Sequence, residues 1–263
     1  MSLNIITRSK LNIHLIGAGG TGGYAAEYLA RLLAGGDHTI HIYDGDMVES
    51  KNLKRQNFTL AELDQNKAEA LCDRLTANIL HAPTLIPHPQ YVKYKEDLLA
   101  EIMLSLEEDE SLIIIQAVDN IATRKMVNEI IMKDLVEVRV LTVALDSGNS
   151  DQGGQVVLYG NAIATWLPPL GEPCRGILPN MLQIYPELAK IEDVNPGLVM
   201  NCADNAESKP QAMMCNVRNG ELLAQIVTKI LERHKAPGNL WKSDLLTGNT
   251  QCTFTGFFDG GAA

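Results

Sequence analysis

Short runs of β-branched and aliphatic residues alternate with helical patterns through the first half of the chain. The run from Leu112 to Ile115 is apolar at every position, which is typical of a strand buried on both faces of a sheet. The segments that predict strands are Asn12 to Ile16, Thr39 to Asp44, Leu112 to Gln116 and Arg139 to Leu145. The segments with apolar residues at three- and four-residue spacing, which predict helices, are Tyr24 to Leu33, Lys67 to Leu80, Lys95 to Leu106 and Ile121 to Lys133. This alternation predicts a parallel sheet covered by helices.

The second half of the chain has a different pattern. Seven of the eleven prolines lie between residues 161 and 210, and so much proline excludes long helices and central strands there. We interpret this segment as an excursion over the surface near the functional site. After it, helical spacing returns from Met213 to Ile230, and Thr250 to Phe258 can form a last strand.

Composition excludes several classes of protein. The chain has 22 Lys and Arg against 32 Asp and Glu, and its formal net charge of −10 disfavours binding to nucleic acid. No apolar run approaches the roughly 18 residues of a membrane span, and the first ten residues show no signal-peptide pattern, so a cytoplasmic location is expected. Neither the five cysteines nor the six histidines show the spacing of a disulfide, metal or nucleophile motif.

A glycine-rich segment joins the first predicted strand to the first predicted helix. It reads Gly17-Ala18-Gly19-Gly20-Thr21-Gly22. Glycines at such a junction let the backbone turn tightly and approach a phosphate, whose charge is met by free N–H groups at the helix N-terminus. Asp44, at the end of the second predicted strand, is placed to accept hydrogen bonds from a ribose, although a turn or cap aspartate would have the same context. Up to this point an NAD-dependent oxidoreductase fits equally well.

The residues after Asp44 separate the two interpretations, because chemistry at a triphosphate needs cations that a dehydrogenase does not. They read Asp44-Gly45-Asp46-Met47-Val48-Glu49-Ser50-Lys51-Asn52-Leu53-Lys54-Arg55-Gln56, and Lys67 follows. This stretch resembles the ThiF/MoeB family of adenylating enzymes, whose pattern D-x-D-x-V-x-x-x-N-L-x-R-Q then K it matches at nearly every defined position. Asp119-Asn120, then Arg124 and Asn128, resemble a further motif of that family, whose wider superfamily includes the ubiquitin-activating enzymes.

The resemblance implies a role for each matching residue and implies ATP and Mg²⁺ as the cofactors. Gly17, Gly19, Gly20 and Gly22 would cradle the nucleotide, and Asp44 would hold the ribose. Asn52, Arg55 and Lys67 would bind the triphosphate, Gln56 would also bind the nucleotide, and Asp119 would ligate Mg²⁺. A carboxylate that attacks the α-phosphate is an anion attacking an anion, so a metal and cations must reduce the repulsion. Two other readings stay open: Arg55 and Lys67 could be solvated surface cations, and Asp119 could cap the following helix.

A narrower resemblance covers the second half. The segments Leu145 to Asn149, Gly154 to Leu158, Leu178 to Asn180, Tyr185 to Leu188 and Asn201 to Ala203 resemble the ThiF-related proteins of PRTRC cassettes. Those cassettes also contain a ParB-related protein and a Mov34/JAB-type peptidase. The resemblance therefore implies a ubiquitin-like conjugation or processing circuit with a functional link to such a peptidase, and the family implies a homodimer.

The sequence departs from the family pattern at two places, and a candidate acyl-accepting thiol lies in a third. Family members usually carry, on a helix before the first strand, an arginine that reaches the partner subunit's nucleotide; here Arg8 is the nearest candidate. The family's zinc knuckle needs a second cysteine after Cys174, but Ile177 stands there, so no zinc site is expected. Cys202 is the first candidate for a thiol that accepts the acyl group, although a free cysteine is more often a small apolar residue.

We predict an α/β fold with a Rossmann-like, doubly wound and mostly parallel sheet, whose first strands run in the order 3-2-1-4-5, with antiparallel additions from the second half. Residues 1–263 are expected to form a single ThiF-like adenylation domain. Its parts are a nucleotide-binding core (1–160), the proline-rich excursion (161–210) and a C-terminal helix and strand (211–263).

The predicted function is ATP- and Mg²⁺-dependent adenylation of a carboxylate with release of pyrophosphate. The predicted substrate is the C-terminus of a ubiquitin-like or sulfur-carrier protein; a peptide or tRNA-linked carboxylate remains open, although the acidic charge disfavours RNA. A non-catalytic nucleotide-binding scaffold of the same family is the first alternative, because the arginine helix is missing. An NAD-dependent oxidoreductase is the second, and Asn52, Arg55, Gln56 and Lys67 argue against it.

Overall fold

Parallel strands form the centre of the computed structural model, which describes residues 3–149, 152–166, 173–174, 178–193 and 213–256. The parallel strands are β2 (Lys10–Ile16), β3 (Thr39–Tyr43), β4 (Thr84–His88), β5 (Glu110–Gln116) and β6 (Thr142–Asn149). They lie in the order β4-β3-β2-β5-β6, which confirms the predicted order 3-2-1-4-5. β5 is buried at all seven positions, as its apolar run predicts.

Antiparallel strands from the second half extend this sheet beyond β6. They are β7 (Gly153–Tyr159), β11 (Leu240–Asp244) and β12 (Thr250–Thr253), and they complete an eight-stranded sheet. A separate four-stranded sheet contains β1 (Leu3–Ile5), β8 (Ile163–Trp166), β9 (Pro173–Cys174) and β10 (Lys235–Ala236). The predicted antiparallel additions are therefore confirmed.

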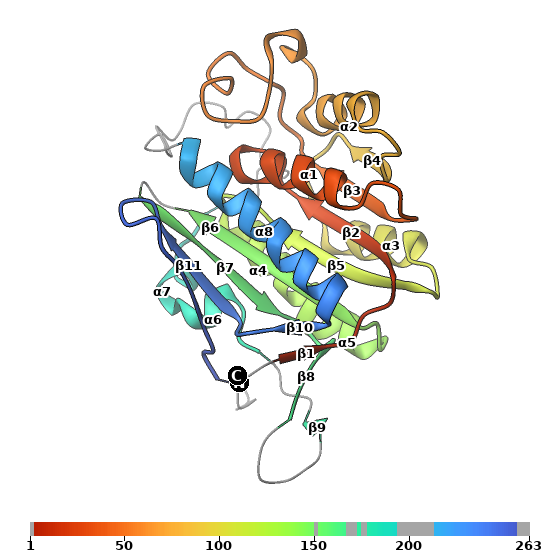
Figure 1. The fold of residues 1–263 in the computed structure, drawn as a ribbon, viewed down its shortest axis with the longest axis vertical. Coiled ribbons are helices and arrows are strands. Elements are labelled where there is room, and N and C mark those ends of the chain that lie inside the picture. Colours follow the sequence, from red (N-terminus) through yellow and green to blue (C-terminus); the bar gives the residue numbers. More distant parts are fainter. Residues whose placement is uncertain (1–2, 150–151, 167–172, 175–177, 194–212, 257–263) are drawn as a thin grey trace.

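Helices cover both faces of the large sheet (Figure 1). On one face lie α1 (Gly20–Leu32), α2 (Lys67–Asn78) and α8 (Met213–Arg233). On the other lie α3 (Lys95–Ser105) and α4 (Ile121–Glu129), which continues through a π-helical turn (Ile130–Asp134) into α5 (Leu135–Glu137). The remaining short helices are η1 (Leu60–Glu62), α6 (Met181–Ile184) and α7 (Pro186–Ala189). Within the described ranges, no helix is long and apolar enough to cross a membrane.

Gly220 lies inside α8 and lets this helix pack closely on α1, although glycine weakens helices. A Cβ atom at this position would lie 2.7 Å from Tyr24 Cβ and 2.9 Å from Ala25 N. Glycine therefore lets the two helix backbones approach each other. Because α8 also packs on β6 and β7, it joins the C-terminal part of the chain to the parallel core.

The local predictions differ from the structure at several places, and the last strand, predicted from Thr250 to Phe258, ends at Thr253. The strand predicted from Arg139 begins only at Thr142, because Arg139 has a φ of 61° and lies in a turn. β4 was not predicted, since Pro87 interrupts its pattern; proline is tolerated there because β4 is the edge of the sheet. β11 was also missed, because the alternation in Leu240–Asp244 is short and ends in polar residues.

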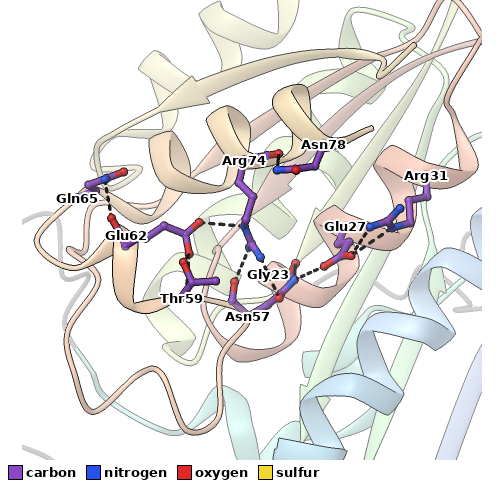
Figure 2. A network of polar contacts seen from close by, with 10 residues as sticks. Gly23, Glu27, Arg31, Asn57, Thr59, Glu62, Gln65, Arg74 and Asn78 are labelled. Atoms are coloured by element: carbon purple, nitrogen blue, oxygen red, sulfur yellow. Dashed lines mark hydrogen bonds and ion pairs between the residues drawn. The ribbon is translucent and has the colours of Figure 1, made fainter. Parts of the chain in front are cut away.

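A network of polar contacts anchors the long loop between β3 and α2 (Figure 2). Arg74 of α2 lies at its centre: Arg74 Nε is 2.9 Å from Glu62 Oε1, and Nη2 donates to the carbonyl of Asn57 at 2.6 Å. Asn57 Nδ2 donates in turn to Glu27 of α1 at 2.8 Å. Glu62 also accepts hydrogen bonds from the backbone and side chain of Thr59. The loop is therefore fixed to two helices through side chains of its own.

Replacing Arg74 by alanine is expected to lower the free energy of unfolding by about 1–3 kcal/mol, because it leaves the buried Glu62 carboxylate without its cation. Arg31→Ala is the matched control, since Arg31 forms an exposed i,i+4 pair with Glu27 and should cost less than about 0.5 kcal/mol. Urea unfolding measures both. Equal losses in the two variants would show that Arg74 does not anchor the loop.

Candidate active site

A pocket of about 720 Å³ opens at the carboxyl ends of β2, β3, β5 and β6. Ligand pockets commonly measure about 300–1,000 Å³, and open α/β sheets bind ligands at this edge. The predicted site residues that line the pocket are Gly17, Gly19, Gly20, Asp44, Asn52, Arg55, Gln56, Lys67 and Asp119. The structure therefore brings together residues from four separate segments of the chain.

The glycine turn after β2 serves backbone packing and leaves a space in front of α1. Gly17 has a φ of +95°, and a Cβ on it would lie 2.7 Å from the carbonyl oxygen of Ala117. A Cβ on Gly22 would lie 1.9 Å from the carbonyl oxygen of Gly17, so Gly22 supports the turn and does not line the pocket. At Gly19 the nearest atom to a Cβ would be Gln56 Nε2, 3.9 Å away. No side chain of the described residues caps α1, so its first N–H groups are available to an anion.

The Asp44 carboxylate is oriented by backbone N–H groups. Oδ2 accepts a hydrogen bond from Ala18 N at 2.7 Å, and Oδ1 accepts one from Asp46 N at 2.8 Å. Burial raises the pKa of Asp44 to about 6, and the nearby Lys67 ammonium only partly opposes this. Asp44 therefore offers a fixed acceptor at the end of β3 whose charge depends on pH near neutrality.

Lys67 is buried and paired with Asp46. Its Nζ lies 2.7 Å from Asp46 Oδ2, and its side chain is only 6% exposed. Burial alone would raise the pKa of Asp46, but the charge and hydrogen bond of Lys67 hold it below its usual value. Asn66, the N-cap of α2, donates through Nδ2 to the carbonyls of Asp44 and Asp46 at 2.9 and 3.1 Å. The turn after β3 is thus tied to the start of α2, and Lys67 is not a solvated surface cation.

Tyr91 covers the same turn. Its hydroxyl donates a hydrogen bond to Asp46, and a Cβ on Gly45 would lie 2.5 Å from its ring. Burial and the hydrogen bond to Asp46 raise the pKa of Tyr91, so the phenol stays protonated. Only glycine at position 45 leaves room for this ring against the pocket wall.

The next turn presents Arg55 and Gln56 to the pocket. Asn52 is buried, its Oδ1 accepts from Glu49 N at 2.8 Å, and its carbonyl accepts from the backbone N–H groups of Arg55 and Gln56. The Arg55 guanidinium has no ion pair within the part of the chain that the structure describes. Gln56 Oε1 is buried and has no hydrogen-bond partner among these residues. A cation and an amide at the pocket wall are therefore available to a ligand.

Asp119 is exposed at the pocket and does not cap α4. Asn120 caps the helix, because its side chain accepts from Thr123 N at 2.7 Å. The Asp193 carboxylate accepts from Ile121 N at 2.6 Å and Ala122 N at 2.7 Å. The helix-cap alternative for Asp119 is therefore wrong.

Arg124 supports the pocket floor from inside the protein. It forms an ion pair with the fully buried Asp146 and donates to the carbonyls of Val118 and Ser147 at 2.5 and 2.7 Å. Burial lowers the pKa of Arg124 to about 10. The arginine of this motif thus holds the ends of β5 and β6 together.

The other residues singled out in the sequence lie away from the pocket or outside the described ranges. The backbone N–H of Arg8 donates to Ser111 Oγ at 2.5 Å, at the amino end of β5, so within its own chain Arg8 lies at the edge of the sheet opposite the pocket. Cys72 is buried in α2, and burial raises its thiol pKa to about 12; Cys252 lies in β12, where burial raises the pKa to about 11. Cys202 lies outside the described residues.

Sequence analysis missed several pocket residues that come from distant segments. Besides Tyr91, the clearest is Asn149 of β6, whose Nδ2 donates to Thr21 Oγ1 at 3.0 Å and to Asn216 Oδ1 at 2.6 Å. Asn216 of α8 donates to the carbonyl of Arg55 at 3.0 Å and lies against Gly20. The only signal for Asn216 was a polar residue on the apolar face of a predicted helix.

Comparison with known proteins agrees with this geometry. The profile of the ThiF family matches residues 6–254. The chain belongs to the ThiF family. This match confirms the family predicted from the sequence motifs.

Named relatives of this ThiF-family chain cover parts of it. It is 30% identical over 163 residues to the adenylyltransferase and sulfurtransferase uba4 of Aspergillus clavatus, which is 61% of this chain and 29% of that protein. It is 35% identical over 79 residues to the ATP-dependent ubiquitin transferase-like protein Cap2 of Escherichia coli, which is 30% of this chain and 13% of that protein. The chain therefore spans less than a third of the length of either relative.

Solved structures share the fold of the ThiF-family chain. E. coli MccB with ATP has a TM-score of 0.63 at 18% identity, over 94% of this chain and 64% of that one. E. coli MccB with AMPCPP and MccA has a TM-score of 0.64 at 17% identity, over 95% and 65%. The likeness extends over nearly the whole chain and confirms the α/β fold with a mostly parallel sheet.

A double-mutant cycle is expected to show that Asp46 and Lys67 act as a pair. Asp46→Asn should lower the free energy of unfolding by about 2–4 kcal/mol, because it leaves a buried ammonium without its carboxylate, whereas Lys67→Met should cost less than about 1.5 kcal/mol. The double variant should be more stable than Asp46→Asn alone. Additive losses in urea unfolding would contradict the pairing. The exposed Lys51–Glu49 pair provides the control, and Glu49→Ala should cost under about 0.5 kcal/mol.

Proposed function

We propose that this protein adenylates a carboxylate with ATP and Mg²⁺ and releases pyrophosphate. The observation that carries the proposal is one pocket in which an uncapped helix N-terminus, a ribose-type acceptor and an uncommitted arginine face the same space. These are the N-terminus of α1, Asp44 and Arg55. Together they match the phosphates and the ribose of a nucleotide.

Features of the pocket fit ATP. The open space at Gly19 lets phosphate oxygens reach the N–H groups of α1, since a side chain there would stand in their way. The buried Gln56 Oε1 would accept a hydrogen bond from a ribose hydroxyl or the adenine amino group, since the ionised triphosphate has no donor, and an unpaired buried acceptor costs free energy. Arg55 supplies the charge that a triphosphate needs.

The reaction forms a bond between a substrate carboxylate oxygen and the α-phosphorus of ATP and breaks the bond from that phosphorus to the bridging oxygen of the β-phosphate. The products are an acyl adenylate and pyrophosphate. Arg55 stabilises charge on the leaving pyrophosphate, while the first N–H groups of α1 hold the phosphates in line. Lys67 contributes positive potential from its place beside Asp46.

Mg²⁺ would supply further charge neutralisation at the triphosphate. Asp119 is the residue that would hold it, because this carboxylate is exposed at the pocket and plays no part in capping α4. Carboxylate oxygen is the ligand that Mg²⁺ prefers.

The acyl substrate is the C-terminus of a ubiquitin-like or sulfur-carrier protein. Beyond the glycine turn, the pocket continues past the end of β6 along Gly148, Asn149 and Gln155 to the apolar Met181 and Leu188. This part combines small, polar and apolar side chains and suits an extended polypeptide end. Relatives agree with this class of substrate: one is named a ubiquitin transferase-like protein, and MccB has been solved with ATP and with MccA.

Further parts of the proposal come from the family resemblance. They are a homodimer, membership in the PRTRC-cassette branch with a functional link to a Mov34/JAB-type peptidase, and a cytoplasmic location. Cys202 remains the candidate thiol for a later acyl transfer. In a homodimer, Arg8 of one chain would have to reach the pocket of the other, since it lies far from its own.

A nucleotide-binding scaffold is the alternative from a different class. It would bind ATP in the same pocket but show no ATP–pyrophosphate exchange with any acyl substrate. An NAD-dependent oxidoreductase is disfavoured because Arg55 and Lys67 both line the pocket, and chemistry at a triphosphate needs such cations whereas a dehydrogenase does not.

Calorimetry with ATP and adenosine tests the proposed triphosphate site. Arg55→Ala should weaken MgATP binding about 10- to 100-fold, the loss of one charge-assisted contact of about 1.5–3 kcal/mol, and leave adenosine binding nearly unchanged. Asp119→Ala should reduce the gain in ATP affinity that Mg²⁺ produces. The control is Lys54→Ala, an exposed cation next to Arg55 that does not line the pocket. NADH binding without ATP binding would contradict the proposal.

The affinity for adenosine should fall as the pH is lowered from 8 to 5, with half of the loss near pH 6. The reason is that the pKa of Asp44 is raised to about 6, and the protonated carboxyl accepts ribose hydrogen bonds poorly. Adenosine is used because it has no phosphate that titrates in this range. Asp44→Asn should bind more weakly and lose this pH dependence; a variant that keeps the same profile would assign the titration to another group.

The same raised pKa has an opposite effect on stability. Because it lies above the ordinary value of 3.8, ionised Asp44 destabilises the folded protein at pH values above about 6, and this cost disappears as the pH falls from about 6 to about 4. Binding and stability should therefore change in opposite directions over this range. The two trends distinguish loss of the ribose acceptor from acid unfolding.

A further inference from the structure

Histidines meet on the face of the sheet that α3 covers. Parallel register pairs His14 with His41 and Tyr43 with His88. Because residues two apart in a strand share a face, all four side chains point to the same side. Ser105 at the end of α3 marks that side, since its Oγ lies 3.3 Å from His14 Nε2.

The rings of this cluster are stacked and held in place. His14 and His41 stack with centroids 4.4 Å apart, and Tyr43 and His88 stack with centroids 4.1 Å apart. His14 Nδ1 is hydrogen-bonded to the Tyr43 hydroxyl at 2.8 Å. The side chains of His41 and His88 are therefore oriented before any ligand arrives.

His41 and His88 point nitrogen atoms at each other. His41 Nδ1 and His88 Nε2 are 3.0 Å apart, and His88 Nε2 is 3.9 Å from Glu101 Oε1 of α3. His41 Nε2 is buried without a hydrogen-bond partner among the described residues. The contact between His41 Nδ1 and His88 Nε2 is therefore the one hydrogen bond of the His41 ring among these residues. Two neutral rings must share a single proton there, whereas a cation between them would bind both lone pairs.

We propose that His41, His88 and Glu101 form a binding site for Zn²⁺ that ties β3, β4 and α3 together. One ligand atom from each of the three lies within 4.8 Å of the other two. A tetrahedral Zn²⁺ with bonds of about 2.0–2.1 Å needs ligand atoms about 3.3 Å apart, and the 3.0 and 3.9 Å distances bracket this value. Water would complete the coordination.

The donor set selects the class of metal. Two imidazole nitrogens and one carboxylate suit Zn²⁺ and related divalent transition ions, whereas Mg²⁺ and Ca²⁺ prefer oxygen alone. Burial lowers the pKa of His41 to about 4 and lowers that of His88 as well, so protons compete weakly with a metal at pH 7. Glu101 is 40% exposed and gives the ion a route from solvent.

This site is separate from the nucleotide pocket, although Tyr43 contacts both. Tyr43 lines the pocket and stacks on His88. Zn²⁺ binding thus requires neither ATP nor the proposed reaction, and each proposal can fail without the other.

Titration of the untagged full chain with Zn²⁺, after chelator treatment and without nucleotide, tests the site. We expect one Zn²⁺ per chain by native mass spectrometry, and a higher melting temperature with Zn²⁺ than without. Glu101→Gln changes a half-exposed helix residue and should fold normally. Glu101→Gln and His88→Asn should each weaken Zn²⁺ binding at least tenfold. His81→Asn is the control, since His81 is exposed, lies outside the cluster and has a φ of 54° that asparagine tolerates.

Co²⁺ provides a second readout that distinguishes this site from cysteine sites. Bound Co²⁺ should show visible absorption without the near-ultraviolet band of a thiolate ligand, and Glu101→Gln should lose that absorption. Wild-type affinity in both Glu101→Gln and His88→Asn, a thiolate band, or no Zn²⁺ binding to the wild type would each overturn the proposal.

Discussion

Parallel pairing on both sides of β2 is the constraint on which the pocket depends. β2 is in register with β3 and β5, and the pairing continues past the strand ends, since Gly17 N donates to the Tyr43 carbonyl at 2.9 Å and Ala117 N to the Ile16 carbonyl at 2.8 Å. The glycine turn and the Asp44 carboxylate therefore emerge side by side. A slip of one residue would turn every side chain of a strand to the opposite face and separate these groups.

The cations around the pocket differ in what they are paired with. Lys67 and Arg124 are buried and each has a carboxylate of its own, Asp46 and Asp146. Removing either carboxylate would leave a buried charge unpaired, so these pairs hold the loops in place whether or not a ligand is bound. Arg55 is half-buried and has no such pair among the described residues, so it can respond to a bound anion. The motif from Asp44 to Lys67 thus contains both a cation that is paired within the protein, Lys67, and a cation without such a pair among the described residues, Arg55.

The sequence predicted the parts of the structure that depend on local pattern. The central position of β5 and the positions of the main helices were predicted, because helical and strand periodicity determine them, and the order of the parallel strands follows from the doubly wound topology predicted for the alternation of strands and helices. The eight-stranded sheet contains strands from both halves of the chain, which supports the single-domain interpretation. What was missed depends on tertiary register: β4 is an edge strand with a proline, Asn216 reaches the pocket from α8, and His41 meets His88 only because β3 and β4 pair in parallel. The spacing of residues along the chain does not predict such contacts between distant segments.

Among the helices that begin at the carboxyl edge of the sheet, α1 and α4 follow the central strands β2 and β5, and of these two only α4 is capped by side chains of the described residues. The N–H groups at the start of α4 are already bonded to Asp193 and to the side chain of Asn120, whereas no side chain caps α1. Anion binding by helix termini is electrostatic and not selective in itself, so two open termini would compete for a phosphate. With α4 filled by the protein's own carboxylate, α1 is the terminus of this central pair that is left for a ligand, beside Asp44. Since Asp44 remains charged at neutral pH against the effect of burial, a ligand with hydroxyl donors can offset that cost. The capped N-terminus of α4 and the buried, ionised Asp44 together favour a ligand that carries phosphates and a ribose.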